Sequence, residues 1–71
     1  MLKFIKVTSK SSKNNVYINI AQIGDVYEYE NGTNIGVLTH NNGGFKVTEN
    51  VEEVMKLIEK ATKNSVLITS N

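Results

Sequence analysis

The sequence has no cysteine, no proline, no tryptophan and no arginine among its 71 residues. Without cysteine it forms no disulfide, and a single histidine is too little for a zinc site within one chain. It also has no apolar run near the roughly 18 residues that a membrane-spanning helix requires, so we expect a cytoplasmic chain. The net charge of +1 does not select a nucleic acid, a membrane surface or an acidic ligand as partner.

The length of the chain allows one domain, and we expect residues 1–71 to form it. A domain this small buries only about 60% of the surface that its unfolded chain exposes. The free energy gained by that burial is close to the conformational entropy lost on folding, and no crosslink adds to it. The size of the chain therefore predicts self-association, which would bury additional apolar surface.

Alternating apolar and polar residues predict two strands near the N-terminus, over residues 3–8 and 16–20. Ile5 and Val7 share one face of the first strand, and Ile18 lies on the buried face of the second. A polar stretch of serine, lysine and asparagine separates the two strands and is typical of a loop.

The clearest hairpin signal is Asn31-Gly32, because a type I′ turn needs a positive φ at both of its central residues. A two-residue loop at this position pairs Val26 with Val37 and Tyr27 with Gly36. A three-residue loop with a bulge would shift this register, so both pairings stay open.

A second turn at Asn42-Gly43 would pair Leu38 with Val47 and His40 with Phe45. The last strand would then place its apolar side chains on the same face as the hairpin tyrosines. Neither face of such a sheet is uniformly polar, whereas an antiparallel sheet with one solvated face has a polar side. We therefore expect a sheet that is rolled into a partial barrel or covered on both sides.

A helix is predicted over residues 50–63. Asn50 is a favoured N-cap, and Glu53 three residues later completes a capping box. The predicted apolar stripe repeats with helical spacing and consists of Val51, Val54, Met55, Ile58 and Ala61. The remaining tail, residues 64–71, holds a short apolar and β-branched run that is typical of an edge strand, paired within the chain or with a second copy.

These elements together predict an α+β fold. A small curved antiparallel sheet of four to five strands occupies residues 1–49, and one C-terminal amphipathic helix over residues 50–63 follows it. Residues 64–71 form the tail.

Candidate catalytic groups are few. His40 sits beside an asparagine–glycine turn with no acidic residue nearby in the sequence, which is typical of a strand end. Strand alternation places Asp25 on the face opposite Glu28 and Glu30, so the carboxylates do not converge on a metal or a proton-transfer site. Lysines could bind phosphates and tyrosines could stack on bases, but the absence of arginine does not favour nucleic-acid binding. We expect no catalytic residue, no cofactor and no metal.

The predicted interaction surface combines the hairpin with the apolar tail. The two tyrosines of the hairpin share one face, with the two glutamates on the other, and tyrosine is a residue type that protein interfaces favour. The tail adds two aliphatic residues that a free segment would not leave in water. The residues of this predicted surface are Tyr27, Glu28, Tyr29, Glu30, Leu67 and Ile68.

Several short segments occur in an order that resembles a known family. They are Val16-Tyr17-Ile18-Asn19, Thr33-Asn34-Ile35, Phe45-Lys46-Val47 and Glu49-Asn50-Val51-Glu52-Glu53-Val54. Over about residues 1–61 this layout is similar to that of the small bacterial FlbD/SwrD-like proteins, which are linked to flagella and swarming. The resemblance implies several strands followed by a helix, no catalytic motif, and a role as an accessory of a larger machine.

We therefore expect a small non-enzymatic binding or accessory protein that acts through homo-oligomerisation or a protein partner. The family resemblance would relate it to motility. The alternative is a phage-encoded small-molecule or nucleotide binder, or a host-factor antagonist, with a pocket between subunits. The composition is rich in asparagine and lysine and suits an AT-rich bacterial or phage genome.

Overall fold

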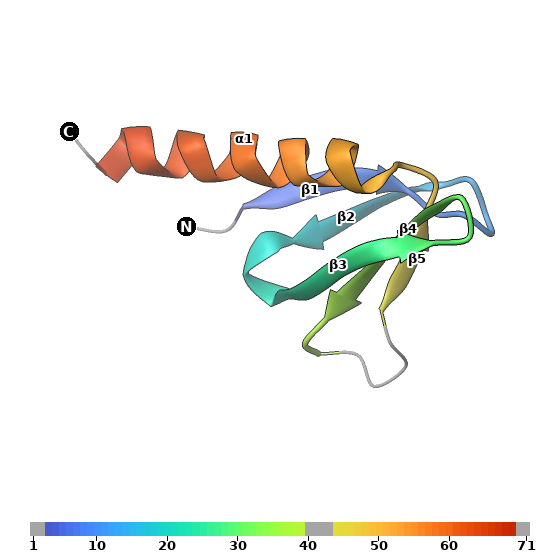
Figure 1. Ribbon diagram of the computed structural model, residues 1–71. Helices are drawn as coiled ribbons and strands as arrows, with labels where there is room; N and C mark the ends of the chain where they lie inside the picture. The colour runs from blue at the N-terminus through green and yellow to red at the C-terminus, as the bar shows by residue number, and fades with distance from the viewer. Residues whose placement is uncertain (1–2, 40–43, 70–71) are drawn as a thin grey trace.

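The computed structural model describes residues 3–39 and 44–69, with side chains as far as Lys63. In this part of the chain the elements are, in order, β1 (Phe4–Thr8), β2 (Asn15–Asn19), the 3-10 helix η1 (Ile20–Gln22), β3 (Ile23–Tyr29), β4 (Gly32–Val37), β5 (Phe45–Val47) and α1 (Val51–Thr69) (Figure 1). The protein is therefore α+β, as predicted, with its long helix after the strands.

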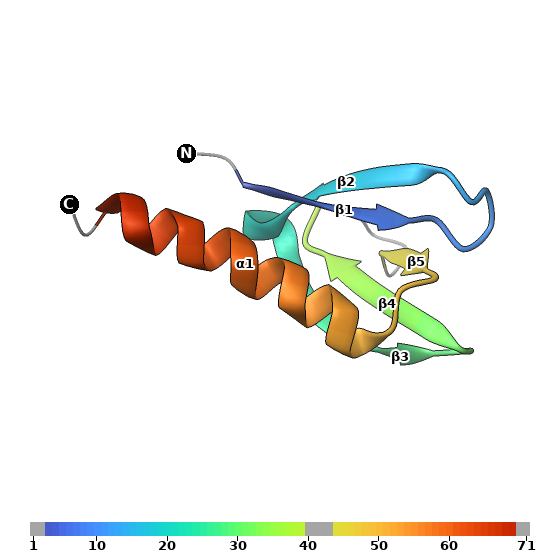
Figure 2. The same cartoon turned by 90° about the horizontal axis from the view of Figure 1, so that it is seen from above.

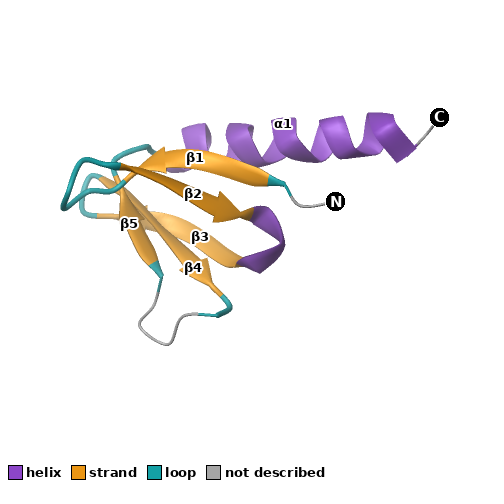
Figure 3. Cartoon of the chain, turned by 180° about the vertical axis from the view of Figure 1, so that it is seen from behind, coloured by secondary structure: helices purple, strands orange, loops and turns teal. Residues whose placement is uncertain are grey.

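The strands form two antiparallel sheets and not the single curved sheet that the sequence predicted. β1 pairs with β2, while β3, β4 and β5 form a second sheet in that order. The sheets meet at one corner, where Ser9 and Val47 form an isolated bridge. The pairing stops there because Ser9 enters a turn, in which its amide donates to the carbonyl oxygen of Asn14 at 2.8 Å. In all three overall views β1 lies between β2 and α1 (Figures 1, 2 and 3).

The turn between β3 and β4 lies one residue earlier than predicted. Its central residues are Glu30 and Asn31, with φ angles of 44° and 63°. Val26 consequently pairs with Ile35, two residues from its predicted partner. A register shift of two residues leaves every side chain on its predicted face, because side chains alternate with a period of two.

Gly32 explains why the turn does not use the asparagine–glycine pair. It begins β4 in a buried position, where an added Cβ would collide with the carbonyl oxygen of Val47. The close approach of β5 needs the glycine inside the sheet. The positive φ angles of the turn therefore fall on the two residues before it.

The register of β5 differs more strongly from the prediction. Phe45 pairs with Ile35, whereas the sequence predicted Val47 opposite Leu38. The displacement is an odd number of residues, so it turns each β5 side chain to the other face of the sheet. Val47 is thus fully buried, away from the tyrosines. The predicted turn at Asn42-Gly43 lies outside the described residues.

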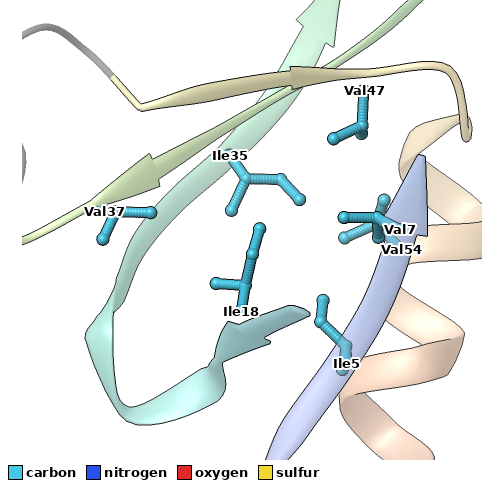
Figure 4. Close-up of a cluster of buried hydrophobic side chains, with 7 residues drawn as sticks. All are labelled: Ile5, Val7, Ile18, Ile35, Val37, Val47 and Val54. Atoms are coloured by element: carbon cyan, nitrogen blue, oxygen red, sulfur yellow. The ribbon is translucent and has the colours of Figure 1, made fainter. Parts of the chain in front are cut away.

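The flipped β5 gathers the apolar side chains into one core between the sheets and α1 (Figure 4). The buried members are Ile5, Val7, Ile18, Ile35, Val37, Val47 and Val54. Val54 has no exposed surface, whereas Met55 of the predicted stripe is 47% exposed. Leu57 packs against the core in its place.

The beginning of α1 confirms the predicted capping box. The amide of Asn50 donates to Oε1 of Glu53 at 2.9 Å, and the amide of Glu53 donates to Oδ1 of Asn50 at 2.8 Å. Two amides that the helix leaves without an internal partner are satisfied reciprocally.

The end of α1 differs from the prediction. The helix continues to Thr69, beyond residue 63, and replaces the edge strand predicted within 64–71. No glycine or proline lies between Val51 and Thr69, so no residue type that stops a helix interrupts this segment. Each further residue of an existing helix adds one hydrogen bond, whereas a separate strand would need a partner edge.

Candidate functional site

The outer face of the β3–β4–β5 sheet, which points away from the core, displays the predicted tyrosines. We call it the tyrosine face and define it by Asp25, Tyr27, Tyr29, Asn34, Leu38 and Lys46. Tyr27 is 50% exposed and Tyr29 is 36% exposed. Nζ of Lys46 lies 5.0 Å from the centroid of the Tyr29 ring, which is a cation–π contact.

The middle of the tyrosine face is a shallow hollow. Asn34 lies between Tyr27 on β3 and Lys46 on β5, and it is only 2% exposed. A space of about 270 Å³ opens beside Tyr27, with Asn34, Gly36 and Leu38 in its lining. Leu38 is 70% exposed. The face thus combines large exposed apolar side chains with a depression that a partner's side chain could enter.

The glutamates of the predicted surface lie apart from the tyrosines. Glu28 is exposed on the inner side of β3, where it shares a hollow of about 430 Å³ with Asn50 and Glu52 at the start of α1. Glu30 lies in the turn, and its carbonyl oxygen accepts a hydrogen bond from Nζ of Lys10. Glu28 therefore points away from the tyrosines, as the alternation predicted, whereas Asp25 shares their face.

The outcome for the predicted tail and for the histidine is limited by which residues the structure describes. Leu67 and Ile68 belong to α1, so they do not form the predicted edge strand, and their side chains lie outside the described part. His40 also lies outside the described residues.

Glu49 has a tertiary role that the sequence did not reveal. Its carboxylate accepts hydrogen bonds from both the amide and the hydroxyl of Thr8, each at 2.9 Å. Its carbonyl oxygen accepts one from the hydroxyl of Thr33 at 2.7 Å. Glu49 thus joins β1, β4 and the start of α1. The contact fixes the core side of the sheet whose other side is the tyrosine face.

Metal binding and acid–base chemistry both need acidic side chains that converge on one point. Among the described residues, no group of three or more histidine, cysteine, aspartate or glutamate side chains is arranged to hold a metal ion. Asp25 lies on the tyrosine face, and Glu28 lies on the opposite face of β3, as predicted. Within the same residues there is no helix with the length and apolar character that crossing a bilayer requires.

Three exposed apolar residues were not assigned to any surface by the sequence. Leu38 was expected to pair with Val47, and only the true β5 register leaves it in solvent. Phe4 and Tyr17 are 51% and 64% exposed on β1 and β2. Strand alternation alone places Phe4 and Tyr17 on the polar faces of their strands. Only the register between β1 and β2 shows that the two residues lie near each other.

Comparison of the chain with protein-family models, with curated proteins and with solved structures gives no match. The resemblance to FlbD/SwrD-like proteins accordingly stays a prediction. The geometry of the described residues is the basis on which a function can be inferred.

Proposed function

We propose that the protein is a small non-enzymatic binding protein whose tyrosine face docks against another protein chain, in the first instance a second copy. The observation that supports this proposal is the exposure of Tyr27 and Leu38 beside one hollow, with Tyr29 exposed on the same face. Tyrosine combines a large apolar body with a polar tip, so it suits a surface that is wet in one state and buried in another. The FlbD/SwrD-like resemblance would place the resulting assembly in bacterial motility.

The distribution of charge favours a second copy as the partner. Asp25 lies on β3 at one edge of the tyrosine face, and Lys46 lies on β5 at the other. If two copies meet face to face about an axis along β4, β3 of each lies over β5 of the other. Opposite charges then come together, and both hollows are covered.

The size of the chain supports the same partner. Seven side chains form the buried apolar core among the described residues, and no disulfide adds to it. Burying the exposed tyrosines and Leu38 in a dimer would contribute roughly 25 cal/mol for each Å² of apolar surface removed from water.

Sedimentation analysis of the purified protein tests the proposal. We expect a dimer at high concentration, and we expect Tyr27→Ser combined with Leu38→Ser to sediment as a folded monomer. Tyr17→Ser is the matched control, because it removes an even more exposed tyrosine from the other sheet and should leave the dimer intact. The docking surface would be refuted if the wild-type protein stayed monomeric at every concentration, or if the double variant still formed the dimer.

A second candidate function is the binding of a small anionic ligand. A hollow of about 390 Å³ lies between the β1–β2 loop and β5, and its lining includes Lys10, Phe45 and Lys46. Amines and an aromatic ring suit a nucleotide. A thermal-shift panel of nucleotides tests it, since binding raises the melting temperature. An unchanged melting temperature across the panel would leave protein docking as the function.

A further inference from the structure

The outer face of the β1–β2 sheet brings together residues that are far apart in the sequence. The strand register places Lys6 directly opposite Tyr17 and Phe4 opposite Asn19. The alternate residues Ile5, Val7 and Ile18 are buried in the core, so the face bearing Phe4, Lys6 and Tyr17 points outward. We call this face the aromatic ribbon and define it by Phe4, Lys6, Tyr17 and Asn19.

The two aromatic residues of the aromatic ribbon are exposed to solvent. Phe4 is 51% exposed and Tyr17 is 64% exposed. The two residues are diagonal neighbours across an antiparallel pair, which separates their Cα atoms by roughly 7–8 Å. Both aromatic residues are thus accessible on one face of the sheet, where a flat ligand can reach their rings.

The charge around the aromatic ribbon is positive. Residues 1–24 contain four lysines and no acidic residue, since Asp25 is the first acid of the chain. Lys6 lies on the ribbon itself and is exposed, and Lys3 immediately precedes β1. Among the described residues, the Glu49 carboxylate is hydrogen-bonded to β1. It lies at the Thr8 end and accepts both hydrogen bonds that Thr8 offers.

Planar rings beside lysines on an open sheet are the chemistry that binds single-stranded nucleic acids. Each base can stack on an aromatic side chain, while ammonium groups neutralise the phosphates. A duplex hides its bases within its own stack and cannot offer them to these rings. Arginine is not needed for this mode, because stacking is tolerant of sequence and reads no base edge.

We propose that the aromatic ribbon binds a single-stranded polynucleotide, with neighbouring bases on Phe4 and Tyr17 and phosphates beside Lys3 and Lys6. The site lies on the other sheet from the tyrosine face and goes beyond the proposed protein docking. The sequence did not favour a nucleic acid, because the net charge is near zero and arginine is absent. The β1–β2 register supplies what the sequence could not, namely the two rings on one surface.

Fluorescence anisotropy with a labelled oligothymidine of about 12 nucleotides tests the proposal, because thymine runs form no duplex. An oligouridine of equal length shows whether DNA and RNA are both bound. We expect saturable binding that weakens about five- to tenfold between about 50 mM and about 200 mM salt, as release of counterions from about two phosphates requires. A DNA duplex of the same length should bind much more weakly.

Three variants assign the binding to the aromatic ribbon. Tyr17→Ala should weaken oligothymidine binding by about tenfold, whereas Tyr17→Phe, which keeps the ring, should bind like the wild type. Lys6→Gln should weaken binding and flatten its salt dependence. Tyr27→Ala on the tyrosine face is the matched control and should bind normally, even where it disrupts the dimer. Circular dichroism shows whether each variant is folded.

Several outcomes would overturn this inference. They are no binding by the wild type at low salt, equal affinity for duplex and single strand, or full affinity in a folded Tyr17→Ala variant. A Tyr17→Ala variant that loses the dimer but not the oligonucleotide would identify the ribbon as a protein contact. Because the dimer is measured separately through Tyr27 and Leu38, failure of one proposal is distinguishable from failure of the other.

Discussion

At the scale of single residues, Gly32 shows how a close approach of two strands shapes the sheet that presents the tyrosine face. The sequence suggested that it serves the turn through a positive φ, but the residues of this turn with positive φ are Glu30 and Asn31. Gly32 is needed because β5 approaches its Cα so closely that no Cβ fits in front of the Val47 carbonyl. A carbonyl in the backbone of a neighbouring strand cannot move aside as the tip of a side chain can.

We therefore expect Gly32→Ala to lower the free energy of unfolding by about 1–3 kcal/mol, the range that overpacking costs. Urea denaturation measures it. Gly24→Ala is the control, because the one tight contact of its Cβ would be with the flexible end of the Leu38 side chain, at 3.0 Å. Equal unfolding midpoints for the two variants would contradict the packing described for Gly32.

At the scale of elements, the β3–β4 hairpin uses a turn that its sequence does not optimise. Residues other than glycine cost roughly 1–2 kcal/mol in the left-handed region, and asparagine suits it better than glutamate. The best dipeptide for the turn, asparagine followed by glycine, lies one position too late. The position of the turn is therefore set by the packing of Gly32 against β5 and not by the turn preference of the local sequence.

Moving the preferred dipeptide into the turn should stabilise the protein. We expect Glu30→Asn combined with Asn31→Gly to raise the free energy of unfolding by about 1 kcal/mol. Thermal and urea unfolding both measure the gain. If the turn instead used residues 31 and 32, this double change would give no gain, so an unchanged or lower stability would speak against the described register.

The helix illustrates how narrow the buried stripe is. Val54 and Met55 are adjacent, yet Val54 is fully buried and Met55 is 47% exposed. We expect Val54→Ala to lower the free energy of unfolding by about 2 kcal/mol, through lost burial and a cavity. Met55→Ala, the matched control, should change it by less than about 0.5 kcal/mol. Similar losses for both would mean that α1 docks with another face.

At the scale of the whole molecule, charge is divided into zones. The N-terminal 24 residues hold four lysines without an acid, and residues 25–45 hold three acids without a lysine. The net charge of +1 conceals this separation. The proposed polynucleotide site belongs to the basic zone, and Asp25 at the edge of the tyrosine face belongs to the acidic zone. A sum over the chain is therefore a poor guide to its partners.

The proposed dimer also predicts how the whole molecule melts. A partner that binds the folded state stabilises it by mass action, so the melting temperature depends on protein concentration. We expect a hundredfold rise in concentration to increase it by about 5 °C in calorimetry. The variant with Tyr27→Ser and Leu38→Ser should show no such dependence. A concentration-independent wild type would argue for a monomer.

Periodicity alone determined which side chains enter the core in β1 and β2 and where α1 begins. These features depend on neighbours a few residues apart, so Ile5, Val7, Ile18 and the Asn50–Glu53 capping box follow from local geometry. Tertiary structure alone decided the registers of β4 and β5, the exposure of Leu38, the junction at Glu49 and the meeting of Phe4 with Tyr17. Each depends on how closely strands distant in the sequence approach one another, and local preferences such as that of Asn31-Gly32 do not encode that distance.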